Sequence, residues 1–426
     1  MTTRISELAN GLRVVTHQMD HLETLSLGVW VGTGARHEPE TLHGISHLLE
    51  HMAFKGTTSR TAQRIAEEIE EVGGEINAAT SIETTAYYAR VLKGDDGTAL
   101  EILADILQDS LFEPIELDRE RDVILQEIAA SQDSPDDLVY DLVQDAAYPE
   151  QPIGRTILGT PKSVQSITSK DLRSYLDHHY APNRLVVSAA GAVDHDSLCR
   201  QAEALFSGGS AATSREPTSG AAVYAGGIRS SKKPFEQSHI VIGFEGPAYR
   251  AEDFFAVQVL SGLLGGGMSS RLFQEVREKR GLCYAIYSSA WGLSDTGLLA
   301  VHAATGPEQM QELVDVVSEE LSRLAQDGPT EAEMGRAKAQ LKAGLMMGLE
   351  SSSARAEQMA RHLMAHDRLI EKEELIAKVE EVSPTQVKEL MQRMIAKQPA
   401  AAVVGAGASS RGHAQRAGHC LGTIRQ

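Results

Sequence analysis

The sequence has 426 residues, of which 42% are hydrophobic and 23% are charged, and its formal net charge is −19. This length predicts two or three domains, because a single hydrophobic core stops growing well below it, and the composition is typical of a soluble globular protein. The negative charge excludes nucleic-acid binding as a main function, since phosphates would be repelled. It favours a cationic partner if the charge is concentrated in a cleft, and the alternative is that acidic runs such as 66–75 simply face solvent.

The sequence predicts neither a membrane segment nor a disulfide framework. No apolar run approaches the roughly 20 residues needed to cross a bilayer. The first residues enter a hairpin-like pattern around Asn10 and Gly11 without the apolar stretch of a secretory signal. Three widely spaced cysteines with no CxxC pair argue against disulfides and against a thiolate zinc site. We therefore expect a cytoplasmic bacterial protein, and a mitochondrial matrix chain that has lost its transit peptide is the alternative.

Residues 43–57, HGISHLLEHMAFKGT, predict an amphipathic helix. Four apolar residues recur at the spacing of a stripe that packs on a core: Ile45, Leu48, Leu49 and Met52. Four residues of metal-binding type lie on the opposite side of this helix: His43, His47, Glu50 and His51. A helix with this pattern predicts a metal site on its polar face.

Two histidines at positions i and i+4 of a helix can bind one metal ion. His47 and His51 have this spacing, and Glu50 lies where a general base for a metal-bound water would be placed. Zinc is the natural candidate, because its catalytic sites use three nitrogen or carboxylate ligands and leave one position open. His43 and His47 form a second pair with the same spacing, and HxxEH also occurs by chance, so a third ligand is needed to decide.

Candidates for the third ligand lie in the helical stretch LDRERDVILQEIAAS. Glu120 and Glu127 are seven residues apart in it and therefore lie about 20° apart on one helix face. One carboxylate could bind the ion while the other orients a histidine through its second ring nitrogen. From the local sequence alone, two solvent-exposed glutamates are the simpler interpretation.

The chain also divides into two similar halves. Residues 207–223 are rich in Ser, Gly, Thr and Pro and predict a linker. A capped helix followed by a small-residue strand occurs at 167–191 and again at 382–406. We predict an α+β fold of two similar tandem domains related by duplication, each a mostly antiparallel sheet covered by helices; the alternative is a chance similarity of two helix–strand units. The predicted boundaries are 1–206 for the N-terminal domain, 224–406 for the C-terminal domain and 407–426 for a disordered tail.

The second half contains a further candidate pair in the stretch RLFQEVREKRGLCYAIYS. Arg277 and Tyr284 are seven residues apart across an apparent helix end, which can place a cation and a phenol on the same side of a turn. A solvated arginine and a half-buried tyrosine are the simpler interpretation of these residues. Cys283 is expected to be a packed thiol, because no histidine partner is near it. His362 and His366 have ligand spacing but no adjacent carboxylate base, and we expect them to pack.

Four sequence blocks carry a resemblance to a known family; in chain order, they are HGISHLLEHMAFKGT, GGEINAATSIETTAYYARV, ERDVILQEI and GGGMSSRLFQEVREKRGLCYAIYS. Together they resemble the pitrilysin and insulysin superfamily of zinc metallopeptidases, whose signature is HxxEH. The resemblance covers nearly the whole chain to about residue 406. Within the superfamily the blocks most resemble the catalytic β-type subunit of mitochondrial processing peptidase and its bacterial relatives.

The resemblance implies one zinc ion per chain. His47, His51 and Glu127 would be its ligands, and Glu50 would be the base that activates the zinc-bound water. Glu120 would orient a ligand from outside the coordination shell, and His43 would not bind the metal.

The resemblance also implies roles in substrate binding. Arg277 and Tyr284 would hold the peptide backbone and stabilise the oxyanion formed at the scissile carbonyl. The segment around Asn77 would supply an edge strand to which an extended peptide adds, and a plain sheet strand is the alternative.

The implied function is that of a zinc-dependent endopeptidase that hydrolyses extended or unfolded peptides. Such a chain is expected to form a homodimer, or a heterodimer with a related chain, and its acidic charge favours basic peptides as substrates. A non-catalytic scaffold subunit is one alternative, although such relatives characteristically lose ligand residues. A structural zinc protein is another, but its site would need a fourth protein ligand.

Overall fold

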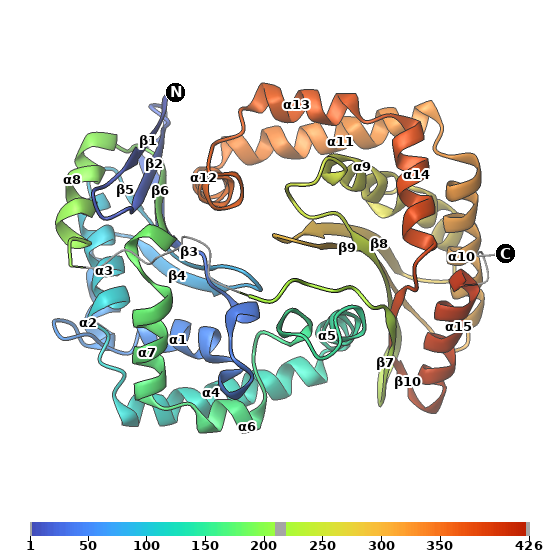
Figure 1. The fold of residues 1–426 in the computed structure, drawn as a ribbon, viewed down its shortest axis with the longest axis horizontal. Helices are drawn as coiled ribbons and strands as arrows, with labels where there is room; N and C mark the ends of the chain where they lie inside the picture. Colours follow the sequence, from blue (N-terminus) through green and yellow to red (C-terminus); the bar gives the residue numbers. More distant parts are fainter. Residues whose placement is uncertain (1, 209–218, 423–426) are drawn as a thin grey trace. The chain divides into compact units, whose positions relative to one another are not determined.

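A computed structural model describes residues 2–208 and 219–422, which form two compact units, each with one β-sheet and covering helices (Figure 1). Unit 1 comprises Met1–Ala129, Thr156–Gly220 and Met347–Leu369, and unit 2 comprises Ala130–Arg155, Ala221–Met346 and Ile370–Gln426. Most of the predicted linker, residues 209–218, lies outside the described residues. Within the described ranges, no helix combines the length and the apolar character needed to cross a membrane.

Unit 1 contains a six-stranded sheet in the order β1-β2-β6-β3-β5-β4. Its strands are β1 (Thr2–Glu7), β2 (Arg13–Gln18), β3 (Thr24–Val31), β4 (Glu75–Thr80), β5 (Thr85–Leu92) and β6 (Leu185–Gly191). Only the β2–β6 pair is parallel, so the sheet is mostly antiparallel, as predicted. The helices of this unit are α1 (Ile45–Ala53), α2 (Ala62–Glu71), α3 (Asp96–Gln108), α4 (Pro114–Asp133, most of its length), α6 (Pro161–Ser166), α7 (Ser169–His179), α8 (His195–Leu205) and α12 (Ser352–His366).

Both faces of this sheet are buried. Successive residues of a strand point to opposite faces, and accordingly Val14 joins the core formed with α1 and α3 while Val15 joins the core formed with α12. The predicted apolar stripe of α1 lies in the first of these cores and is fully buried. This burial turns the opposite side of α1, with its histidines, away from the sheet.

Unit 2 contains a second sheet in the order β10-β7-β9-β8. Its strands are β7 (Gly227–Gly246), β8 (Ala285–Gly292), β9 (Gly297–Thr305) and β10 (Ala400–Ala406). Its helices are α5 (Pro135–Ala147), α9 (Phe254–Gly265), α10 (Met310–Asp327), α11 (Glu331–Glu350, most of its length), α13 (Lys372–Glu381), α14 (Pro384–Ile395) and α15 (Ser410–Gly422). Shorter turns complete the two units: η1 (Ala35–His37), η2 (Glu40–Leu42), η3 (Pro152–Gly154), η4 (Pro182–Arg184), the π-helical η5 (Phe273–Glu278) and η6 (Gly407–Ser409).

The two sheets repeat one topology. Residues 400–403 of β10 pair in parallel with residues 227–230, in the first part of the long strand β7. They also pair with residues 243–240, in the last part of β7, where the partners run in the opposite direction. In unit 1, β6 is parallel to β2 and antiparallel to β3 in the same way. Gly191 at the end of β6 and Gly405 near the end of β10 both have positive φ. The predicted duplication is therefore visible in strand pairing as well as in sequence.

The units differ from the predicted boundaries because they exchange helices. The 20-residue helices α4 and α11 each contain a boundary between units. Helix α5, which follows α4, packs on β7 and β10 of unit 2. Helix α12, which follows α11, packs on β3 and β6 of unit 1. Ala356, Met359 and Leu363 of α12 are buried against Trp30. Each sheet is thus completed by a helix from the other half of the sequence.

The prediction of a disordered tail at 407–426 is wrong for residues 407–422, the part of the tail that the structure describes. Residues 407–422 form η6 and α15, and Ala414 and Ala417 of α15 are buried in the core of unit 2. Arg416 anchors the helix through a two-armed ion pair with Asp315, at 2.7 and 2.8 Å. Both side chains that α15 contributes to this hydrophobic core within the described residues are alanines, so the sequence shows no periodic pattern of large apolar residues.

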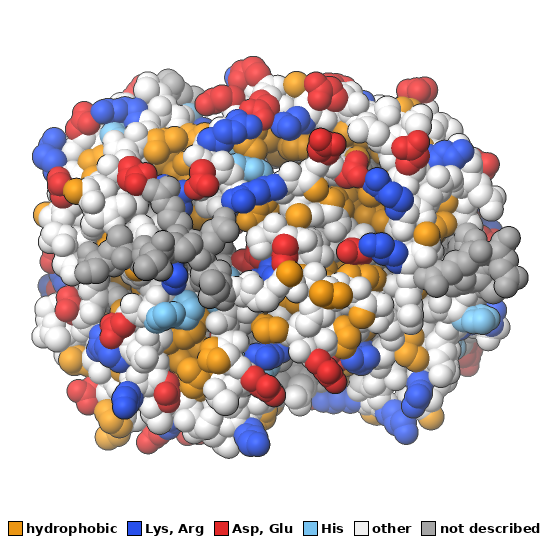
Figure 2. All heavy atoms as spheres, viewed as in Figure 1, with side chains coloured by type: hydrophobic (Ala, Val, Ile, Leu, Met, Phe, Trp, Pro, Cys, Tyr) orange, Lys and Arg blue, Asp and Glu red, His pale blue; other side chains and the backbone are white. Residues whose placement is uncertain are grey.

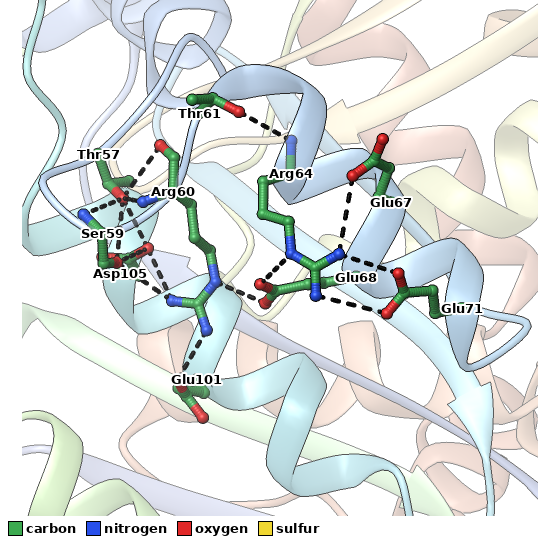
Figure 3. A network of polar contacts seen from close by, with 10 residues as sticks. All are labelled: Thr57, Ser59, Arg60, Thr61, Arg64, Glu67, Glu68, Glu71, Glu101 and Asp105. Atoms are coloured by element: carbon green, nitrogen blue, oxygen red, sulfur yellow. Dashed lines mark hydrogen bonds and ion pairs between the residues drawn. The ribbon is translucent and has the colours of Figure 1, made fainter.

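The acidic run at 66–75 is partly neutralised by arginines. Arg64 pairs with Glu68 and Glu71 of α2, at 2.8 and 2.9 Å, and Arg60 also pairs with Glu68, at 2.7 Å (Figure 3). On the face of the molecule shown in Figure 2, acidic and basic side chains are interspersed. These observations favour local ion pairing and solvation as the explanation of this acidic run.

Candidate metal centre

The first turn of α1 is held by a buried carboxylate. The backbone N–H groups of Gly44 and Ser46 donate to the two oxygens of Glu38, at 2.7 and 2.8 Å. Gly44 has a φ of 92°, and an added Cβ would lie 2.9 Å from backbone atoms of Leu158 and Gly159, so glycine is required there. This anchoring fixes the helix that carries the predicted ligands.

Three predicted ligands converge beside α1. The Nε2 atoms of His47 and His51 lie 3.6 and 3.7 Å from Oε2 of Glu127, which α4 supplies. The three side chains form a group whose ligand atoms all lie within 4.8 Å of one another. The side chains of His47 and His51 are largely buried, while that of Glu127 is 39% exposed, so the group has access to solvent.

The donor set fits zinc. At bond lengths of about 2.0–2.2 Å, tetrahedral ligands of zinc lie about 3.4 Å apart, close to the two nitrogen–oxygen distances. These distances are too long for hydrogen bonds. Burial, and then the neighbouring His51, lower the pKa of His47 to about 4, so its imidazole is neutral at pH 7 and can bind a metal. The arrangement can therefore hold zinc with two nitrogen ligands and one oxygen ligand.

Glu120 orients His51 from outside this group. Its Oε2 lies 3.0 Å from Nδ1 of His51, and its Oε1 accepts from Nζ of Lys55 at 2.7 Å. A proton on Nδ1 that is donated to Glu120 leaves the lone pair of Nε2 directed at the metal position. Lys55 was not predicted; it follows His51 by four residues and lies just beyond the end of α1, where helical periodicity no longer places a side chain.

Glu50 lies next to the ligands but outside the group of three. Its Oε2 accepts a hydrogen bond of 2.5 Å from Oγ1 of Thr80, at the end of β4. Burial raises the pKa of Glu50, and the hydrogen bond from Thr80 opposes that shift. A carboxylate with a raised pKa is suited to take up and return a proton near neutral pH. Thr80 was also missed, although it lies in the block GGEINAATSIETTAYYARV.

His43 lies apart from this group. Its Nε2 is 2.7 Å from the backbone oxygen of Thr156, and the side chain is buried. Of the two i, i+4 pairs on the helix, the geometry therefore selects His47 and His51.

Asn77 lies on β4, the last strand of the six-stranded sheet. Its Oδ1 accepts from the backbone N–H of Ala78 at 2.8 Å, and its side chain is exposed. The strand pairs with β5 on one side, and no strand among the described residues pairs with its other edge.

In unit 2, Arg277 and Tyr284 lie together as the spacing predicts. The guanidinium carbon of Arg277 is 5.3 Å from the ring centre of Tyr284 and 4.6 Å from that of Phe273. Gly281 turns the chain between them with a φ of 63°. Tyr284 is 77% exposed, so the alternative of a half-buried core tyrosine is wrong.

The remaining candidates behave as packed residues. Cys283 is buried, and burial raises the pKa of its thiol to about 11, which disfavours the thiolate. The rings of His362 and His366 lie 6.2 Å apart, and no third ligand in the described part of the chain completes a metal cluster with them.

Comparison with known proteins shows to which protein family this chain is similar. Residues 13–161 match the family described as insulinase, peptidase family M16, and residues 166–341 match the family described as peptidase M16 inactive domain. An uncharacterized zinc protease of Rickettsia felis is 40% identical over 402 residues, which cover 94% of this chain and 97% of that protein. The chain belongs to the M16 family of peptidases.

Other M16 relatives have similar extents. The uncharacterized zinc protease YmxG of Bacillus subtilis is 37% identical, with 93% of this chain and 96% of that protein covered. Two crystal structures share the fold. A protease from Helicobacter pylori has a TM-score of 0.86 at 23% identity, covering 95% of this chain and 99% of that one, and the M16 inactive domain from Pseudomonas fluorescens has 0.87 at 21%, covering 95% and 98%. The predicted superfamily and fold class are confirmed, while the closer resemblance to the processing-peptidase β-subunit stays a prediction.

Proposed function

We propose that this M16 chain is a zinc-dependent endopeptidase that cleaves extended or unfolded peptides, as a processing peptidase does. The observation that carries the proposal is the convergence of His47, His51 and Glu127 at the spacing of zinc ligands, with Glu50 beside them and outside the ligand set. The zinc protease names of its relatives support it.

The roles of the residues in unit 1 follow from their contacts. When bound by the three ligands, zinc would polarise the scissile carbonyl and acidify a water molecule. Glu50 takes the proton of the attacking water and passes it to the leaving amine, and the hydrogen bond from Thr80 fixes one of its oxygens during both transfers. Glu120 holds His51 in the tautomer that can act as a ligand.

Substrate binding is assigned to three further residues. The open edge of β4, with Asn77, offers backbone groups to an extended peptide, and such pairing does not select for particular side chains. Arg277 and Tyr284 hold the peptide backbone and stabilise the developing oxyanion, a role that suits an exposed phenol packed on a guanidinium. We further propose basic peptides as preferred substrates and a dimer, with itself or a related chain, as the active form.

The proposal is tested with a quenched fluorescent basic peptide. Wild-type protein should cleave it, a chelator should abolish cleavage, and added zinc should restore it; His51→Ala should remain inactive after zinc is added. The exposed His21→Ala serves as the matched control and should cleave like wild type. A zinc-loaded, folded wild-type protein that cleaves no member of a peptide library would overturn the proposal in favour of a non-catalytic subunit.

A further inference from the structure

A second group of metal-binding side chains converges in unit 2. It consists of Asp136 in the first turn of α5, His239 on β7 and His302 on β9. The Nδ1 atom of His239 lies 3.2 Å from Oδ1 of Asp136 and 3.2 Å from Nε2 of His302. The distance from Nε2 of His302 to Oδ1 of Asp136 is also 3.2 Å. Each pair of ligand atoms is therefore close to the roughly 3.4 Å that separates tetrahedral ligands of zinc.

Hydrogen bonding does not account for this triangle. If one imidazole nitrogen carries a proton, it can donate to the other two atoms, but those two then face each other with lone pairs. If both nitrogens carry protons, the two N–H groups of His239 and His302 oppose each other across 3.2 Å. One of the three contacts is thus repulsive in either state. A cation between the atoms makes all three contacts favourable, because each atom then directs a lone pair at it.

Burial and ring packing hold the two imidazoles in place. His302 is 2% exposed and His239 is 5% exposed, while the side chain of Asp136 is 58% exposed. The ring of His302 packs against two phenols, with its centre 4.7 Å from that of Tyr287 and 5.9 Å from that of Tyr140. The exposed aspartate leaves the group open to ions from solvent.

The equivalent position in unit 1 shows which side chains are sufficient to pack the first turn of a helix on the sheet. Gly191 and Gly405 mark equivalent strand ends, and the residues before them, Ala190 and Val404, pair with Ser26 and His239 respectively. At the unit 1 position, Ser26 Oγ lies 2.9 Å from the hydroxyls of Ser352 and Ser353, in the first turn of α12. Small neutral hydroxyls suffice there to dock a helix on the sheet. In unit 2 the same docking position has a histidine and an aspartate, with a second histidine added.

We propose that Asp136, His239 and His302 form a second binding site for a divalent transition metal, of which Zn²⁺ is the best match, distinct from the centre at His47 and His51. Two nitrogens and one carboxylate are the donor set that zinc and its neighbours in the first transition row accept. The bound ion joins the first turn of α5 to two strands of the unit 2 sheet. Its role is therefore to stabilise the packing of a helix that comes from the other half of the sequence.

Metal stoichiometry tests this site independently of peptidase activity. Full-length protein is stripped of metal, loaded with Zn²⁺, freed of excess ion by gel filtration and analysed by atomic emission. We expect two equivalents for wild type, one for Asp136→Asn, one for His302→Gln, and two for the control Ser26→Ala at the equivalent position of unit 1. The double variant His47→Ala, His51→Ala should also retain one equivalent, and adding Asp136→Asn to it should leave none.

The possible outcomes separate the two metal sites. Because Asp136 is exposed, Asp136→Asn is expected to fold even if His302→Gln does not, and circular dichroism checks both. Added Zn²⁺ should raise the melting temperature of the His47→Ala, His51→Ala variant and should have no such effect once Asp136→Asn is included. Binding of one equivalent by wild type, unchanged in Asp136→Asn and lost in the double variant, would overturn this proposal and leave the proposed function intact.

Discussion

Nδ1 of His51 lies 3.0 Å from the carboxylate of Glu120, which is itself 5% exposed and paired with Lys55. This contact directs the other ring nitrogen of His51 at Glu127. It predicts that Glu120→Gln, which changes charge and not shape, weakens zinc binding about 10–100-fold. Competition with a chromophoric chelator measures the effect.

The matched control for this change is Glu116→Gln, one turn earlier on α4, where the carboxylate pairs only with the exposed Arg119 in the described contacts. Zinc affinity should be unchanged in this control. Equal affinity of Glu120→Gln and wild type would show that the contact does not support the metal centre.

Arg60 links the loop after α1 to α2 and α3. Its guanidinium pairs with Glu68, Glu101 and Asp105 at 2.7, 2.7 and 2.9 Å, and its side chain is 12% exposed (Figure 3). Removing it in Arg60→Ala leaves Asp105, whose side chain is 9% exposed, without this partner and should lower the free energy of unfolding by about 3 kcal/mol. Urea denaturation followed by circular dichroism measures the loss.

Arg64→Ala is the comparison for this prediction. Arg64 also pairs with glutamates of α2, but its side chain is 44% exposed, so its loss should lower the free energy of unfolding much less than the loss of Arg60 does. Similar losses in the two variants would contradict the importance assigned to burial.

His37 gives unit 1 a predictable dependence on pH. Burial, and then the adjacent Arg36, lower the pKa of His37 in the folded chain to about 4, from about 6.5 in an unfolded chain. Between these values the unfolded state binds the proton more readily, so stability is lost as pH falls from 6.5 towards 4, and His37 contributes no pH dependence above that range. His37→Gln should reduce the slope of unfolding free energy against pH in this window, by at most about 1 kcal/mol per pH unit.

The exposed His21 provides the control for the pH experiment. His21→Gln should leave the slope of wild type unchanged. An identical slope in His37→Gln would mean that other groups cause the acid sensitivity.

Tyr284 is expected to act on the reaction without affecting folding. Because it is 77% exposed, Tyr284→Phe should leave the melting temperature and zinc content as in wild type. Loss of one donor to an oxyanion typically costs about 100-fold or more in kcat, and we expect a decrease of that order. Peptide cleavage kinetics measure kcat for Tyr284→Phe and wild type. An unchanged kcat would show that Tyr284 does not stabilise the oxyanion.

The sequence predicted those parts of the site that lie on one regular element. His47, Glu50 and His51 follow from the helical period, and the buried stripe of α1 is as expected. Glu127 lies on a different helix, so periodicity made it only a candidate and the family resemblance was needed to select it. Thr80 could not be predicted, because its contact with Glu50 depends on where β4 ends relative to α1.

The less predictable features arise from contacts between distant segments. His239 and His302 lie on neighbouring strands, and Asp136 reaches them because α5, which belongs to the first half of the sequence, packs on the sheet of the second half. The same exchange explains why the predicted domain boundaries, which assumed consecutive segments, differ from the two compact units. The helix α15 was missed because it buries alanines in place of larger side chains.

We propose that Glu50 serves the chemistry and does not hold the metal. The most direct measurement compares Glu50→Gln with wild type for zinc content and peptide cleavage, with the exposed Glu40→Gln as control. We predict unchanged zinc content in all three proteins, with cleavage lowered about 100- to 10,000-fold in Glu50→Gln alone. Full cleavage by a zinc-loaded Glu50→Gln, or loss of zinc together with activity, would contradict this role of Glu50.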